Sequence, residues 1–141
     1  DLDALKLALV LLFLQPGAPC VYYGTEAALA GGPEPGCREG YPWDRPRNKA
    51  LQALIQDMAD LRTQHAAIRE GRLTWSPHGS DGLLGETDGL QVVINRSRNQ
   101  LLPLADRIRS GTVIWSSDGL HTHSDSLSCQ SAVVVMGGES P

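Results

Sequence analysis

The sequence predicts an α+β fold in which helices precede an antiparallel β-sandwich. Apolar residues recur at helical spacing over residues 48–64, with polar residues between them. After residue 68 the period changes, and six short β-prone runs alternate with turn residues such as Asp88-Gly89. A single bulky run at residues 20–23 is typical of a buried parallel strand, yet the sequence offers it no parallel neighbour.

Composition limits the classes to which the chain can belong. Its 141 residues have a mass of 15.2 kDa, the size of one domain or two small modules. Hydrophobic residues make up 41% and charged residues 20%, which excludes a disordered chain. The net charge is −4 and the basic residues are scattered, so we expect no nucleic-acid partner. Cys20, Cys37 and Cys129 are too few and too far apart for a disulfide framework, which favours free thiols in the cytoplasm.

The first predicted element is a helix over residues 1–14, with Asp3 as its N-terminal cap. Residues 7–14 are all apolar, but a run this short cannot cross a membrane, which needs about 20 residues. A helix that is apolar all round is normally a buried one. Because the chain begins with Asp1 rather than Met, we expect an upstream segment that would cover this helix. Without that segment, we expect the helices of several copies to pack together, so that the chain self-associates.

The next elements are the strand over residues 20–23, a long loop over residues 24–47 and the amphipathic helix over residues 48–64. The loop contains five Gly and four Pro and no apolar period. A loop of this length is usually functional or tightly folded on itself.

The β part begins after residue 68. We expect strands at residues 72–75, 83–87, 90–96, 100–104, 112–116 and 132–136, with a seventh candidate at residues 127–129. Asp88-Gly89 between two of these runs predicts a two-residue hairpin.

Several motifs match one known family in the same order. Residues 17–26 read G-A-P-C-V-Y-Y-G-T-E, which resembles the G-x-P-x-x-Y-Y-G-x-E segment of the α-amylase family, glycoside hydrolase family 13. Further along, residues 31–44 resemble the family's G-G-x-D-P-x-x-R and M-P-W-D stretches, residues 61–71 its L-R and A-L-R-x-G, and residues 90–97 its V-V-I-N-x-S strand. Glu34 departs from the family pattern, because an aspartate is usual at that position.

The resemblance implies a C-terminal fragment of such an enzyme. Residues 1–67 would supply two helices and one strand from the end of a (β/α)8 barrel, and residues 68–141 the C-terminal β domain. The parent enzyme would cleave or transfer α-linked glucose units in an α-glucan or maltooligosaccharide. The family's catalytic carboxylates and its calcium site lie upstream, so we expect no catalytic residue, metal site or cofactor here, and an inactive isolated chain.

Glu34 and Arg38 are the candidate substrate-binding residues. They are four positions apart in a loop that the resemblance places at the active-site face of the barrel. The carboxylate accepts and the guanidinium donates hydrogen bonds, so the pair could clamp sugar hydroxyls. The alternative is a local salt bridge that stiffens the loop, and the sequence does not separate the two.

Other residues have weaker claims. Glu26 lies beyond the expected barrel strand, where we expect it to hold loops rather than to act as an acid. For Tyr22 and Tyr23 we expect packing in the barrel, and for Trp43 an anchor for the loop, with stacking on a sugar as the alternative.

The β part contains one possible metal-binding cluster, made of His121, His123 and Asp125. No third histidine or thiolate lies at ligand spacing, so a solvated turn is the preferred interpretation. Asn95 begins a glycosylation sequon in form only. The alternative function for the whole chain is a non-catalytic carbohydrate-binding or structural β module.

Overall fold

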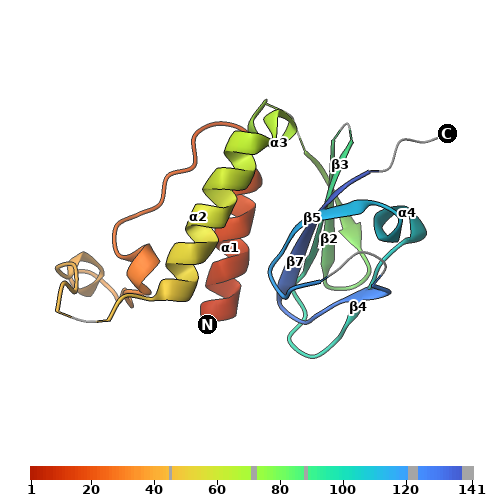
Figure 1. Ribbon diagram of the computed structural model, residues 1–141. Coiled ribbons are helices and arrows are strands. Elements are labelled where there is room, and N and C mark those ends of the chain that lie inside the picture. The colour runs from red at the N-terminus through yellow and green to blue at the C-terminus, as the bar shows by residue number, and fades with distance from the viewer. Residues whose placement is uncertain (45, 71–72, 88, 121–123, 138–141) are drawn as a thin grey trace.

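The computed structural model describes residues 1–44, 46–70, 73–87, 89–120 and 124–137. Three layers follow one another in space: helices, a five-stranded sheet, and a thin second β layer (Figure 1). The elements, in chain order, are α1 (Leu2–Leu14), η1 (Thr25–Ala27), η2 (Gly36–Arg38), α2 (Lys49–Gln64), α3 (Ala66–Glu70), β1 (Thr74–His78), β2 (Gly82–Thr87), β3 (Leu90–Asn95), β4 (Leu102–Pro103), α4 (Asp106–Arg109), β5 (Thr112–Ser116), β6 (Ser126–Leu127) and β7 (Ser131–Met136). The predicted α+β class is confirmed.

Helix α1 forms where the sequence predicts it, but its cap is different. The Oδ1 atom of Asp1 accepts from the backbone N–H of Asp3 at 3.2 Å and of Ala4 at 3.3 Å. The prediction of Asp3 as the cap is wrong, because Asp3 lies inside the first turn and pairs with Lys6 at 2.8 Å. The unsatisfied donors of a first turn are reached from the residue that precedes it.

The predicted strand at residues 20–23 does not form a ladder with any described residue. Residues 20–22 have no regular secondary structure, Tyr23 lies in a turn, and Cys20, Tyr22 and Tyr23 are exposed. A parallel strand needs a neighbouring strand to hydrogen-bond, and the strands within the described residues all pair antiparallel in the β domain.

Helix α2 confirms the amphipathic pattern. Asn48 caps it by accepting from the backbone N–H of Leu51 at 3.1 Å. Its apolar face is buried against α1, through Leu51, Leu54, Met58 and Leu61. Helix α1 therefore lies between α2 and the sheet (Figure 1).

The five-stranded sheet has the order β1-β2-β3-β7-β5, and every neighbouring pair is antiparallel. The predicted hairpin is confirmed, because Thr87 pairs with Leu90 and leaves a two-residue turn. Gly89 in that turn has φ +73°, a conformation that glycine adopts without strain.

Alternate residues of the central strands fill two cores on opposite faces of the sheet. On the helical face, Val92, Ile94 and Val134 pack with α1 and α2. On the other face, Val93 and Val133 pack with side chains of β4, β6 and α4. The predicted sandwich thus has a small second layer, made of the β4-β6 ribbon and the short helix α4. Of these elements, α4 was not predicted from the sequence.

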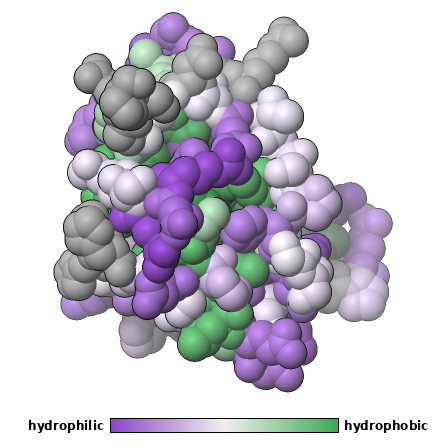
Figure 2. Space-filling model, turned by 90° about the vertical axis from the view of Figure 1, so that its right-hand side faces the viewer, coloured by the Kyte–Doolittle hydropathy of each residue, from purple (hydrophilic) through white to green (hydrophobic). Residues whose placement is uncertain are grey.

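The outer face of the β domain, turned away from the helices, carries a band of hydrophilic side chains with hydrophobic patches between them (Figure 2). Ion pairs of α4 with neighbouring segments are exposed, among them Arg107 with Glu86 at 3.1 Å. No helix among the described residues is long and apolar enough to span a membrane.

Candidate functional site

The loop of residues 24–47 projects from the helical layer on the side away from the sheet (Figure 1). Gly24, at φ +83°, turns the chain into η1, and its carbonyl accepts from the N–H groups of Ala27 at 3.1 Å and Leu29 at 2.9 Å. The hydroxyl of Tyr23 donates to the carbonyl of Glu39 at 2.9 Å, which ties the far part of the loop to its start. The start of the loop also packs on the helical layer, through η1 against α2 and Ala28 against the helical core. The rest of the loop leaves most of its side chains in solvent.

Glu34 and Arg38 are brought together within this loop. The Arg38 Nη2 atom lies 2.6 Å from Glu34 Oε1, and the two side chains are 72% and 66% exposed. The local salt bridge is therefore formed, and it fixes the direction of the guanidinium while leaving most of both groups open to solvent. Their role as a sugar clamp stays a prediction.

The aromatic residues near the loop are exposed. Tyr22 and Tyr23 are 64% and 43% exposed, and their ring centroids are 4.7 Å apart. The pKa of Tyr23 is raised above its ordinary value of 10.0, mainly by desolvation and to a smaller extent by the neighbouring Tyr22. Its hydroxyl is therefore protonated and can donate at neutral pH. The expected packing of these two rings in a barrel is not seen, because the described residues form no barrel strand for them to pack against.

The expected anchoring role of Trp43 is wrong for this structure. The indole is 79% exposed, and its ring contact is with Tyr41, at a centroid distance of 4.5 Å. The loop passes no core surface of the described chain at this point. Glu26, in η1, is half-buried and makes no hydrogen bond or ion pair with a described residue.

The candidate metal cluster of the β domain lies only partly within the described residues. His121 and His123 lie outside the described residues, and Asp125 pairs with Arg109. Within the described ranges, no group of three His, Cys, Asp or Glu side chains could hold a metal ion.

The sequon residue Asn95 is only 1% exposed, and its side-chain N–H₂ donates to carbonyls of Gln100 at 2.8 Å and Ser128 at 2.9 Å. A glycan could not reach an amide in that position. The three cysteines are free, as predicted.

Sequence reasoning missed a cavity of about 380 Å³ between α1, α2 and the ends of β5 and β7. Its polar lining includes Asp3, Lys6 and Asp57 of the helices, and its apolar lining includes Trp115. No sequence signal indicates it, because its walls come from segments more than a hundred residues apart.

No family model matches the chain. The chain is 33% identical over 125 residues to a cyclomaltodextrinase from Bacillus sp., a match that covers 86% of this chain and 21% of that protein. It is 33% identical over 132 residues to a maltogenic α-amylase from Bacillus acidopullulyticus, covering 85% of this chain and 22% of that protein. The fold is similar to part of the cyclic α-maltosyl-(1→6)-maltose hydrolase from Arthrobacter globiformis, with a TM-score of 0.74 and 28% identity over 98% of this chain and 30% of that one.

Helices followed by an antiparallel β domain, similar in sequence and in fold to one region of these enzymes, define the class of protein. The chain belongs to the α-amylase family and corresponds to a C-terminal portion of its enzymes, as its motifs predicted. It spans about a fifth of the length of the curated relatives described above.

Proposed function

We propose that the chain works as the C-terminal part of a longer enzyme that hydrolyses or transfers α-linked glucose units by a retaining double displacement. The observation that carries this proposal is the 33% identity to a cyclomaltodextrinase over 86% of the chain. A retaining mechanism needs a nucleophilic carboxylate and a carboxylic acid on either side of the bond. In the family both come from barrel strands upstream of this segment, so the chain supplies support and substrate contacts.

Within that enzyme, Glu34 and Arg38 would bind sugar hydroxyls. Their exposure supports this role, because a solvent-filled position leaves their remaining donors and acceptors free for a ligand. The ion pair would hold the guanidinium in one direction before substrate arrives.

Replacement of Arg38 in the full-length enzyme tests this assignment. Arg38→Ala should lower kcat/KM for maltooligosaccharides while the melting temperature stays nearly constant, because an exposed ion pair contributes only about 0–1 kcal/mol. Arg69→Ala is the matched control, since Arg69 forms a similarly exposed pair with Glu70 at 2.8 Å outside the loop. A lower melting temperature with unchanged kinetics would show that the pair only stiffens the loop.

Because the catalytic carboxylates of the proposed enzyme would lie upstream, we expect the isolated chain to have no glycosidase activity. Purified chain incubated with maltooligosaccharide should release no more glucose than a blank. Release that disappears on Glu26→Gln would instead place a working acid in this segment. Maltooligosaccharide binding by residues 68–141 alone would favour the alternative, a carbohydrate-binding β module.

We also propose a cytoplasmic location, which the free thiols support, and self-association of the isolated chain. Helix α1 is covered by α2 and the sheet more fully than the sequence suggested, but an apolar groove of about 340 Å³ remains beside it, lined by Leu5, Leu12, Val21 and Tyr22 among others. A second copy would cover that groove. Light scattering that shows only the 15.2 kDa monomer at high concentration would exclude this association.

A further inference from the structure

The cavity between α1, α2 and the ends of β5 and β7 has a distinct apolar wall. Leu7, Val10 and Leu54 form its helical side, and Trp115 forms its strand side. The register of β5 shifts between Val113 and Trp115. As a result Trp115 packs, like Ile114, toward the helical core. The shift therefore aims a half-buried indole at the space between sheet and helices.

The helices supply a polar rim to the same cavity. Lys6 holds Asp3 at 2.8 Å, and side chains of the pair are 36% and 54% exposed. Asp57 of α2 is exposed and makes no hydrogen bond or ion pair with a described residue. Ala53 and Ala50, about one and two turns earlier on α2, are the small side chains that leave the cavity open. Both oxygens of Asp57 are thus free to accept hydrogen bonds.

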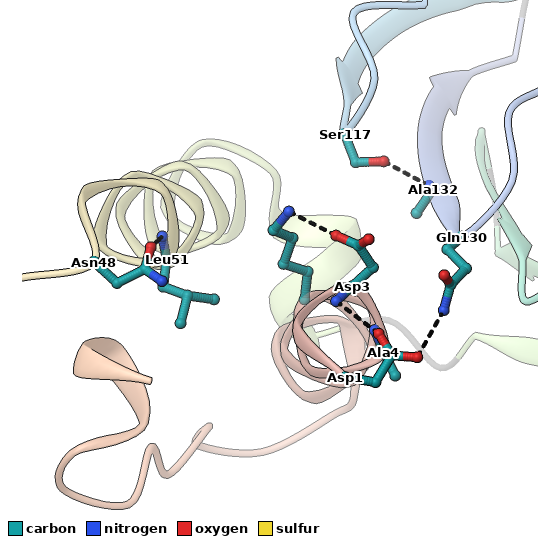
Figure 3. Close-up of polar contacts among 9 residues, drawn as sticks. Asp1, Asp3, Ala4, Asn48, Leu51, Ser117, Gln130 and Ala132 are labelled. Carbon is teal, nitrogen blue, oxygen red and sulfur yellow. Dashed lines mark hydrogen bonds and ion pairs between the residues drawn. The ribbon is translucent and has the colours of Figure 1, made fainter. Parts of the chain in front are cut away.

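The strand side contributes a third set of polar groups. Gln130 is one of two non-glycine residues with a left-handed conformation among the described residues, at φ +46°, and its side-chain amide reaches Asp1 at 3.4 Å. Figure 3 shows Gln130 and Ser117 on the strand side, opposite Asp1 and Asp3 at the start of α1. A strained backbone at a cavity wall is common at ligand sites.

We propose that this cavity binds one pyranose ring of a glucose-containing carbohydrate. Its volume is at the lower end of the range of small-molecule sites, about 300–1,000 Å³. A sugar ring has an apolar face that packs on an indole and a rim of hydroxyls that donate to carboxylates. The cavity offers both, with Trp115 on one side and Asp57 on another.

The charges of the lining argue against other small ligands. Asp57 and Asp118 would repel an anion. A cation would meet the ammonium of Lys6, while Asp3 is already neutralised by that ammonium and Asp118 already accepts from Ser116, Leu120 and Ser128. A neutral ligand with many hydroxyl donors satisfies the free acceptors without a new buried charge. None of the lining residues belongs to the loop of residues 24–47, so this site is independent of Glu34 and Arg38.

Titration of the isotope-labelled chain with maltose, followed by the backbone amide signals in nuclear magnetic resonance, tests the proposal. Maltose should shift the amides of Asp57, Ser117 and Gln130 in a saturable way. Asp57→Ala should weaken binding about tenfold, the usual scale for losing a hydrogen bond to a charged group. Asp60→Ala is the matched control, because Asp60 is exposed on the same helix and does not line the cavity.

A second variant blocks the cavity without touching its polar groups. Ala53→Leu fills the space from an exposed helical position, where leucine is nearly as good a helix former as alanine. It should abolish the maltose-dependent shifts, whereas Ala66→Leu, at an exposed position of α3 outside the cavity, should leave them intact. The amide signals far from the cavity report that each variant is folded.

Three outcomes would overturn the proposal: no saturable shift with maltose, unchanged binding in both Ala53→Leu and Asp57→Ala, or shifts of the same amides by L-arginine but not by maltose. Loss of binding in Arg38→Ala would place the sugar on the loop instead. Failure of the parent enzyme to act on α-glucans would leave these results unaffected, so the two proposals can fail separately.

Discussion

Arg62 is the side chain whose removal should destabilise this fold most clearly. It is only 9% exposed, and it comes from α2 to cap the end of α1. Its Nη1 atom donates to the carbonyls of Phe13 at 2.7 Å and Gln15 at 2.9 Å, and Nη2 donates to the carbonyl of Gly17. The last turn of α1 contains no basic residue, so a guanidinium from another helix satisfies its free carbonyls and complements its dipole.

Arg62→Met keeps the apolar stem and removes all three donations. The carbonyl of Phe13 would stay buried and unpaired, which costs about 1–3 kcal/mol. Gln15 and Gly17 are exposed, so water can replace the lost donors there at about 1 kcal/mol or less each. We therefore expect the free energy of unfolding to fall by about 3 kcal/mol. For a chain of this size, that loss lowers the melting temperature by about 10 °C.

Urea unfolding followed by circular dichroism measures this change. Arg62→Lys should give an intermediate loss, because one ammonium keeps the charge but cannot span three carbonyls. The exposed Arg69→Met should change stability by about 0.5 kcal/mol or less. If the free energy of unfolding of Arg62→Met is within about 1 kcal/mol of the wild-type value, Arg62 does not stabilise the fold by capping α1.

Two further changes should alter stability in the β domain. Asn95→Asp turns a buried donor into a carboxylate that faces the carbonyls of Gln100 and Ser128. We expect the free energy of unfolding, measured with urea, to fall by about 3–5 kcal/mol. A fall below about 1 kcal/mol would contradict the hydrogen-bond assignment. Burial acts to raise the pKa of Asp118, but hydrogen bonds from Ser128, Ser116 and the Leu120 amide outweigh it and hold the pKa below the ordinary 3.8. A lowered pKa adds stability that is present above about pH 4 and is lost as the pH falls through the folded value. Asp118→Asn should therefore narrow the difference in unfolding free energy between about pH 6 and about pH 3, and an unchanged difference would show that Asp118 titrates normally.

Elements whose apolar residues repeat at a regular spacing within one segment could be predicted from the sequence. Helix α2 and strands β2 and β3 follow directly from apolar spacing, and the hairpin between those strands follows from a turn that needs glycine. In contrast, residues 20–23 have the composition of a strand but no partner strand in the part of the chain that the structure describes, so β-propensity alone could not produce a ladder. Helix α4 was missed because four polar-rich residues carry too little periodicity to indicate a helix.

The candidate loop was predictable by resemblance, and its ion pair by spacing, but the cavity was not. Spacing within one segment brings Glu34 and Arg38 together. Asp57 and Trp115 line one cavity only because α1, α2 and the sheet pack around the same space. Arg62 illustrates the same limit. Its position in the L-R motif suggested family membership, and only the packed helices reveal that it caps a helix 49 residues away in sequence.

The placement of α1 also bears on how the two parts of the chain are joined. The change of period near residue 68 supports a division into residues 1–67 and 68–141, but periodicity reports local structure and not packing. Ile68 itself lies in α3, and the helical core contains side chains of α1 together with Val92 and Val134 of the sheet. Because each part leaves an apolar face that the other covers, separating them would expose the sides of α1 and of the sheet together. The cavity lies at this junction, so a ligand bound there would contact both parts and would stabilise the arrangement that holds them together.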